Sequence, residues 1–281
     1  MTCIIMLMQS CINETEPTPA NSSVSLPNTT HMVIKYGERL YETDVITGDS
    51  VSYLNDEYSI FYKTFIENDD NVAAFLSIEE NGNLFVEYFP SEQDLLSKFE
   101  FYYLDNMDEE VYDYTYTRSG VIDLWPPNNT GELIGMAELF DDKYFEDTVL
   151  VTYATTNWAT AVPYLSNLGF NDKTSSIRVH NKMISNQKYT MKGYDENSHL
   201  NMGTYYGSQL RPILKCYHNS NYSGSVIYCI AKPTGSSELH LDYNLKNIGW
   251  NDRISAISWI VIGDMSYING SNPEFPAHPE C

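Results

Sequence analysis

The sequence has few basic residues: 16 Lys and Arg stand against 38 Asp and Glu, which gives a formal net charge of −22. A surface of that charge repels the phosphates of nucleic acids and of anionic membranes, so neither is an expected partner. The acidic balance favours cations, although it is also typical of proteins that only need to stay soluble.

Cysteine is scarce as well, with five in 281 residues, and no CxxC pair indicates a zinc or redox site. The six histidines show no HExxH spacing, and the sequence contains neither a GxSxG motif nor a P-loop. Its paired carboxylates lie in acidic runs that are typical of solvated surfaces. We therefore expect that the protein is not an enzyme.

No apolar run is long enough to span a bilayer. Residues 1–11 form a short apolar segment ending in Ser10 and Cys11, and a stretch rich in Asn, Thr, Pro and Ser follows over residues 12–31. This segment resembles a bacterial lipoprotein signal, which implies lipidation of Cys11, although no Lys or Arg precedes the run. A non-lipid secretion signal and a chance apolar end are the alternatives. Either signal predicts a linker over 12–31 and an extracytoplasmic protein, either secreted or lipid-anchored at the cell surface.

The carboxyl half contains an internal repeat. Residues 168–179 and 248–259 align without gaps and are identical at five of twelve positions. Each copy has a Gly, an aromatic residue, an Asn-Asp pair and a Ser, followed by alternating apolar residues. This pattern predicts a turn that leads into a half-buried strand.

These turns resemble those of the βγ-crystallin family, whose Greek-key motifs carry the sequence Asn/Asp, Asn/Asp, two variable residues, Ser/Thr and Ser, and bind calcium in many members. Asn171 to Ser176 fits at every position, and Asn251 to Ala256 departs only at the last. The second family signature is a hairpin of Tyr/Phe, four residues, Tyr/Phe, one residue and Gly. Residues 217–224 match it fully, whereas residues 153–160 have Thr160 where a Gly with positive φ is expected.

By this resemblance the paired turns hold calcium. The backbone carbonyl of the third turn residue and the hydroxyl of the fifth would bind one ion, while the carboxylate of the second would cross to the ion of the partner turn. A carbonyl of the hairpin would add a ligand. The predicted ligands are Asp172, Lys173, Ser175, Asp252, Arg253, Ser255, Ala154 and His218, with Asn171, Asn251 and Ser176 stabilising the turns. One carboxylate per site predicts weak affinity, on the order of micromolar to millimolar.

The predicted fold is an α+β amino-terminal module followed by an all-β βγ-crystallin-like Greek-key sandwich. The amino-terminal module should contain a helix after Asn55, a hairpin around Asn81-Gly82 and a helix after Ser91. An acidic, Tyr-rich connector should include a short helix over 135–147. The predicted boundaries are 32–105 for the module, 106–148 for the connector, 149–263 for the crystallin-like domain with an insertion over 183–212, and 264–281 for a loose tail.

Cys216 and Cys229 flank the second hairpin, and a pairing centred near Tyr222 and Ser223 would place them opposite each other. A disulfide and two free buried thiols are both compatible with this arrangement. We expect an extracellular protein that calcium stabilises. The alternative is a partner-binding module, for example a protease inhibitor, that uses the fold without metal and contacts its partner through 183–212. The tyrosines could also line a carbohydrate-binding surface, although Tyr is common in strands.

Overall fold

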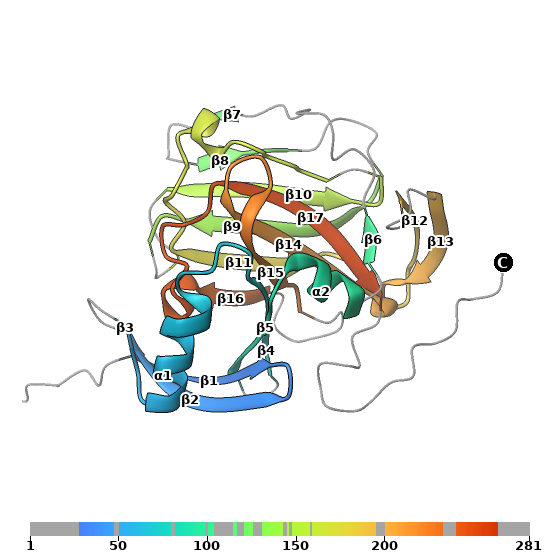
Figure 1. The fold of residues 1–281 in the computed structure, drawn as a ribbon. Helices are drawn as coiled ribbons and strands as arrows, with labels where there is room; N and C mark the ends of the chain where they lie inside the picture. The colour runs from blue at the N-terminus through green and yellow to red at the C-terminus, as the bar shows by residue number, and fades with distance from the viewer. Residues whose placement is uncertain are drawn as a thin grey trace, which may run out of the picture.

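The computed structural model describes residues 28–47, 51–79, 82–98, 101–103, 115–116, 121–125, 131–142, 145, 148–157, 159–194, 200–232 and 240–263. Within these ranges the fold is mostly β, with three sheets and two short α-helices (Figure 1). No helix in this part of the chain is long and apolar enough to cross a membrane. The predicted signal segment with Cys11, the linker up to residue 27 and the tail over 264–281 lie outside the described residues.

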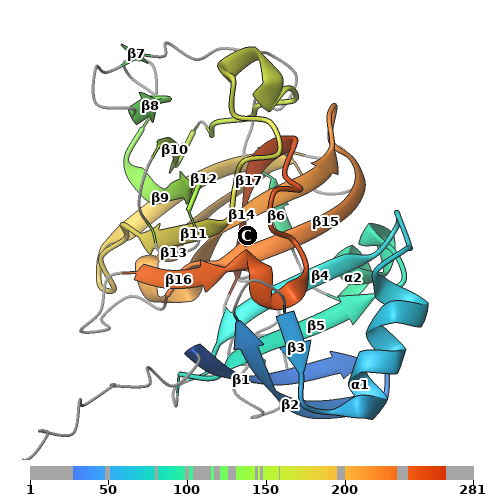
Figure 2. The same cartoon turned by 90° about the vertical axis from the view of Figure 1, so that its left-hand side faces the viewer.

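The largest sheet has the strand order β3-β2-β1-β5-β4-β15-β14-β17-β6. Its strands are β1 (Asn28–Tyr36), β2 (Arg39–Thr47), β3 (Val51–Tyr53), β4 (Ala73–Ile78), β5 (Leu84–Phe89), β6 (Phe101–Tyr103), β14 (Leu210–Asn219), β15 (Ser223–Ile230) and β17 (Ala256–Gly263). The parallel pairing of β4 with β15 joins the amino-terminal strands to those of the carboxyl half. Both parts of the chain therefore contribute to one hydrogen-bonded sheet (Figure 2).

The second sheet has the order β16-β11-β9-β10-β8-β7. It consists of β7 (Thr115–Tyr116), β8 (Val121–Asp123), β9 (Leu133–Phe140), β10 (Val149–Thr155), β11 (Ser176–Asn181) and β16 (His240–Asn244). The indole of Trp259 on β17 donates to the Thr152 hydroxyl on β10 over 3.0 Å, and both side chains are buried. This bond and the shared apolar core show that the two sheets pack against each other.

With the strands that precede each Asn-Asp turn, the first repeat contains β9, β10 and β11, and the second contains β14, β15, β16 and β17. Each repeat places one segment in the sheet of the other. In the second repeat, β16 pairs with β11 of the first repeat, from Ser176 opposite Asn244 to His180 opposite His240. In the first repeat, Val162 forms a bridge with Ile257 on β17 of the second. Each repeat therefore completes the sheet of the other.

The hairpin of β12 (Lys188–Tyr194) and β13 (Leu200–Tyr206) forms the third sheet. It lies within the segment 183–212 that the sequence predicts as an insertion between the repeats. Among the described residues, these two strands pair only with each other. The insertion thus has its own secondary structure beside the two large sheets (Figure 1).

The predicted helix, hairpin and helix of the amino-terminal part are present. The side chain of Asn55 accepts a hydrogen bond from the Tyr58 amide and caps α1 (Asp56–Phe61), which continues as a π-helical turn over Tyr62–Ile66. The hairpin is β4 with β5, and α2 (Glu92–Lys98) follows Ser91, whose hydroxyl accepts from the Asp94 amide. The sequence did not predict β1 and β2. The predicted linker over 12–31 is wrong for its last four residues, because β1 begins at Asn28.

The predicted short helix over Gly135 to Asp147 is wrong, because Leu133–Phe140 forms strand β9. This strand lies between β10 and β11 and pairs with both. Met136, Ala137 and Glu138 favour helices as isolated residues, but pairing on two sides outweighs that local preference.

Candidate functional site

Each repeat contains a short 3₁₀-helix that leads into its Asn-Asp turn. These helices are η2 (Leu165–Leu168) and η4 (Leu245–Ile248), and each ends at a glycine in the left-handed region, Gly169 with φ 66° and Gly249 with φ 73°. Glycine adopts this conformation without the steric cost that a Cβ would add. The repeat in the sequence therefore corresponds to a repeat in backbone geometry, as predicted.

The two turns also pair with each other through their backbones. The Asp172 amide donates to the Ile254 carbonyl, and the Asp252 amide donates to the Thr174 carbonyl, both over 3.1 Å. Both aspartates have positive φ values, 52° and 55°. This conformation is uncommon outside glycine, and its occurrence at equivalent positions fixes both side chains in equivalent directions.

The aspartate of each turn lies against the serine of the other. The Ser255 hydroxyl donates to Asp172 Oδ1 over 3.0 Å, and the Ser175 hydroxyl donates to Asp252 Oδ1 over 3.1 Å. Both serines are buried and both aspartates are exposed. The structure thus brings together four of the eight predicted ligands as two matching oxygen pairs.

The two asparagines hold the turns from the other side. Asn171 donates to Asp172 Oδ2, and Asn251 donates to Asp252 Oδ2. Each carboxylate therefore has one oxygen held within its own turn and the other directed to the partner turn. Ser176, predicted to stabilise the first turn, donates to the Asp142 carbonyl.

The variable turn positions differ between the repeats. Lys173 is exposed, whereas Arg253 donates to the Gly249 carbonyl over 3.2 Å and lies over the Trp250 ring. The second turn therefore carries a guanidinium bound to its own backbone.

The hairpin predicted over residues 153–160 is not the one that contacts the first turn. The Ser255 amide donates to the Tyr217 carbonyl, and the Ser175 amide donates to the Phe140 carbonyl, over 2.9 and 2.8 Å. Phe145 and Tyr222 correspond as well: their φ values are 62° and 54°, and their rings lie 5.7 and 5.4 Å from those of the two carbonyl residues. The first hairpin therefore follows β9 and not β10.

This correction removes Ala154 as the counterpart of His218. Ala154 lies in β10, opposite Gly135. Thr160, expected to be strained in place of Gly, takes no positive φ, and its hydroxyl both donates to the Tyr153 carbonyl and accepts from the Tyr153 amide. The spacing of Phe140 and Phe145 equals that of the aromatics of the second hairpin, and this match could have identified the first hairpin from the sequence.

Asp141 takes the position in the first hairpin that His218 takes in the second, since each follows the aromatic residue that binds a turn serine. The pKa of Asp252 is raised by partial burial and by the nearby carboxylates of Asp141 and Asp172. Asp141 is therefore a candidate ligand that sequence reasoning missed. It gives the oxygen pair of Asp252 and Ser175 a second carboxylate nearby.

His218 gives the other pair a different environment. Its pKa is lowered by burial and then by the positive charge of Arg253, while Asp70 and Asp172 act in the opposite direction. The oxygen pair of Asp172 and Ser255 thus has an imidazole and a guanidinium as neighbours. The two oxygen pairs match in geometry but differ in charge.

The donor set suits calcium better than a softer ion. Calcium accepts carboxylate, hydroxyl and carbonyl oxygens at 2.3 to 2.6 Å, and oxygens about 3 Å apart can share one such ion. The Asp and Ser oxygens of each pair have this separation. Among the described residues, no three His, Cys, Asp or Glu side chains form a ready metal-binding group, so a calcium ion here would also need hydroxyl and carbonyl oxygens.

The predicted facing positions of Cys216 and Cys229 are wrong. Cys216 lies opposite Ile227, Cys229 lies opposite Leu214, and both thiols are free and buried. The hairpin turns one position earlier than expected, because the register shifts after Tyr217 and the turn residues 221 and 222 have positive φ.

No protein-family model matches this chain, and no curated protein or solved structure matches it significantly. The paired turns are therefore the main guide to its function.

Proposed function

We propose that this protein is an extracytoplasmic calcium-binding protein of the βγ-crystallin type, that calcium stabilises its fold, and that it is not an enzyme. The observation that carries this proposal is the reciprocal contact of Asp172 with Ser255 and of Asp252 with Ser175. An ion between the members of each pair would be bound by both repeats at once. Unfolding would then require its release, so calcium would raise the free energy of unfolding.

The strand arrangement supports a Greek-key interpretation. The first repeat supplies β10-β9-β11 to one sheet and the second supplies β15-β14-β17 to the other, in matching order. The remaining segment of each repeat joins the opposite sheet. In this interpretation β1 to β5, α1 and α2 are the proposed α+β amino-terminal module.

Calcium concentration and affinity fit the proposed location. With few carboxylates at each site, we expect dissociation constants on the order of micromolar to millimolar, which suit an extracytoplasmic protein better than a cytosolic sensor. The proposal of secretion or of a lipid anchor at Cys11 rests on the sequence of residues 1–11. Calcium ions are the proposed ligand, and the net charge of −22 disfavours nucleic acid.

Titration calorimetry on chelator-treated protein tests the proposal. The wild-type protein should bind two calcium ions and melt at a higher temperature in millimolar calcium. Asp172→Asn and Asp252→Asn should each abolish one site, and the double variant both. Asp56→Asn removes the same charge from an exposed helix turn and should bind like the wild type. No heat of binding and no thermal shift in the wild-type protein would refute the proposal.

A partner-binding module that needs no metal is the second candidate. Ile184, just before β12, is 62 % exposed, and Tyr206, the last residue of β13, is 45 % exposed; both lie within 183–212. Exposed large apolar side chains on a separate hairpin are a typical contact surface for another protein. A protein partner captured through this hairpin should stay bound after calcium is chelated.

A further inference from the structure

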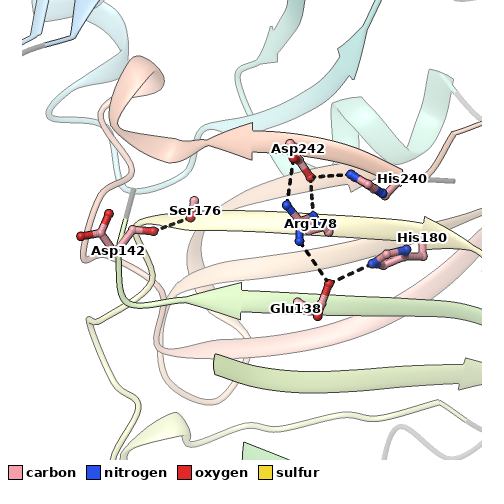
Figure 3. Close-up of polar contacts among 7 residues, drawn as sticks. All are labelled: Glu138, Asp142, Ser176, Arg178, His180, His240 and Asp242. Carbon is pink, nitrogen blue, oxygen red and sulfur yellow. Dashed lines mark hydrogen bonds and ion pairs between the residues drawn. The ribbon is translucent and has the colours of Figure 1, made fainter. Parts of the chain in front are cut away.

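Five charged or titratable side chains form a cluster on one face of β9, β11 and β16. Figure 3 shows Arg178 at its centre, between the carboxylates of Asp242 and Glu138, with His180 and His240 beside them. On the same strands, Ile177, Val179 and Leu241 point into the core and are buried. The cluster therefore lies on the outward face of the six-stranded sheet, and none of its side chains belongs to the paired turns.

The strand register sets the positions of these side chains. His180 is directly opposite His240 in the antiparallel pair, and Arg178 is directly opposite both Asp242 and Glu138 on its two neighbouring strands. The two imidazole rings have centroids 5.2 Å apart. Because directly opposite Cβ atoms lie only about 5 Å apart, two opposite histidines can reach one ion by side-chain rotation alone.

Each imidazole faces a carboxylate through the same nitrogen. His180 Nε2 lies 3.0 Å from Glu138 Oε2, and His240 Nε2 lies 3.5 Å from Asp242 Oδ1. His180 Nδ1 is buried and makes no hydrogen bond, so Nε2 is the nitrogen available to an ion. Zinc binds His nitrogen and carboxylate oxygen at about 2.0 to 2.2 Å, and two such ligands of a tetrahedral ion lie a little over 3 Å apart. Both separations are close to that value.

We propose that His180, His240, Glu138 and Asp242 bind one divalent transition ion of the zinc or copper class. Imidazole and carboxylate are the ligands that these ions accept, and their order of affinity places copper above zinc. Calcium would not compete, because it prefers oxygen ligands throughout. This site is independent of the calcium proposed at the paired turns.

Arg178 would compete with the ion for the carboxylates of Asp242 and Glu138. Its Nε and Nη2 donate to the two Asp242 oxygens over 2.8 and 3.1 Å, and its Nη1 lies 3.8 Å from Glu138 Oε2. The guanidinium therefore contacts both carboxylates, and the side chains of the cluster must move before three of them can share one ion. An ion must take at least one carboxylate from Arg178 and sit near its positive charge, so removing this charge should tighten binding.

Titration of the full chain with zinc, in calcium excess to saturate the turns, tests this proposal. The wild-type protein should bind one zinc ion at the cluster, His180→Gln and His240→Gln should each weaken that binding at least about tenfold, and Arg178→Gln should tighten it several-fold. Gln retains hydrogen-bonding capacity at each position, and circular dichroism verifies folding. His31→Gln is the matched control, because His31 has its own carboxylate partner in Asp44 and lies outside both the cluster and the turns; it should leave zinc affinity unchanged. Copper bound to the wild type should show two nitrogen ligands by electron paramagnetic resonance, and one in either cluster variant.

Absence of zinc binding to the wild-type protein at millimolar concentration would overturn the proposal, whatever the variants do. Zinc binding that is unchanged in both His180→Gln and His240→Gln would overturn it as well, because the ion would then occupy another place. Repeating the titration without calcium separates the two proposals. Failure of calcium to bind the turns leaves the zinc result standing, and the reverse also holds.

Discussion

The Ser175 hydroxyl donates a hydrogen bond to the Asp252 carboxylate across 77 residues of chain. Ser175→Ala removes that hydroxyl and should weaken one calcium site by about tenfold, or about 1.4 kcal/mol, which is near the lower end of the range for a hydrogen bond to a charged group. Ser255→Ala should do the same at the other site, where its hydroxyl faces Asp172. Calorimetry measures both, with exposed Ser208→Ala as the control. Equal affinity in all three variants would show that the hydroxyls are not ligands.

The difference between Asp141 and His218 predicts unequal calcium sites. Each residue can be replaced by the other in a single variant. Asp141→His should weaken calcium binding at the Asp252 site, and His218→Asp should strengthen it at the Asp172 site. A charge change a few Å from a divalent ion near the surface is worth about 1 kcal/mol, or a factor of about five. Two-site calorimetry of both variants measures the change. Identical isotherms for both variants and the wild type would remove Asp141 from the site.

Gly249 joins the second turn to the amino-terminal part of the chain. A Cβ at Gly249 would lie 1.8 Å from the Tyr62 hydroxyl oxygen, and the φ of 73° adds its own cost. Gly37 has φ 57° with no atom within 4 Å of an added Cβ. Gly37→Ala should therefore reduce the free energy of unfolding by about 1 kcal/mol, and Gly249→Ala by at least about 2 kcal/mol more, measured by urea denaturation.

A double-variant cycle separates the two contributions at Gly249. In a Tyr62→Phe background the hydroxyl is absent, so Gly249→Ala should destabilise the protein less than it does in the wild type. Tyr62→Phe also removes the hydrogen bond from Tyr62 to the Ile248 carbonyl. An unchanged cost in both backgrounds would mean that the backbone conformation alone opposes alanine.

Lys215 carries a buried charge in β14. Its side chain is 5 % exposed, and its ammonium lies 2.7 Å from Glu92 on α2. Burial acts to lower the pKa of Lys215, but Tyr217 and Glu92 outweigh it, so the net shift is upward and the charge is retained. Glu92→Ala should reduce the free energy of unfolding by about 3 kcal/mol, because it leaves the ammonium buried without its carboxylate.

Lys215→Met in the Glu92→Ala background checks this explanation. The double variant should recover part of the lost stability, since no unpaired charge is left in the core. Glu57→Ala, on the exposed first turn of α1, controls for loss of a carboxylate. A double variant less stable than Glu92→Ala would show that the unpaired ammonium is not what destabilises Glu92→Ala.

Glu138 should make stability depend on acid pH. Its pKa is lowered from 4.5, first by the hydrogen bond with His180 and also by Arg178, against the opposing effect of burial. A carboxylate with a lowered folded pKa stabilises the protein above its ordinary pKa, and that contribution disappears as the pH falls through the folded value. The free energy of unfolding of the wild type should exceed that of Glu138→Gln by less than about 1 kcal/mol near pH 7. This difference should vanish well below pH 4.5. A gap that does not change with pH would rule out this linkage.

Local signals in the sequence were sufficient for the repeated turns and for the helix caps at Asn55 and Ser91, because both depend on neighbouring residues. Such local signals could not predict that residues 133–140 form strand β9. Its Met136, Ala137 and Glu138 favour a helix in isolation, and only pairing with β10 and β11 makes the segment a strand. The two candidate hairpins of the first repeat have the same aromatic spacing, so contacts with Ser175 were needed to choose between them.

Contacts between distant segments account for the rest. The parallel pairing of β4 with β15 joins residues 73–76 to residues 226–229, and no pattern in either segment encodes its partner. The cluster around Arg178 combines three strands that are far apart in the chain. The crossing of Asp172 and Asp252 to the partner serines was expected only from the resemblance, and calcium binding there stays a prediction.

The pairing of β16 with β11 has a consequence during synthesis of the chain. A ribosome makes residues 176–181 long before residues 240–244, so the six-stranded sheet emerges with β11 as an uncovered edge. Such an edge presents free amides and carbonyls to any neighbouring strand until its own partner arrives. Slow elongation or a truncated product would therefore expose this protein to intermolecular strand pairing, and β16 protects the finished chain by covering that edge.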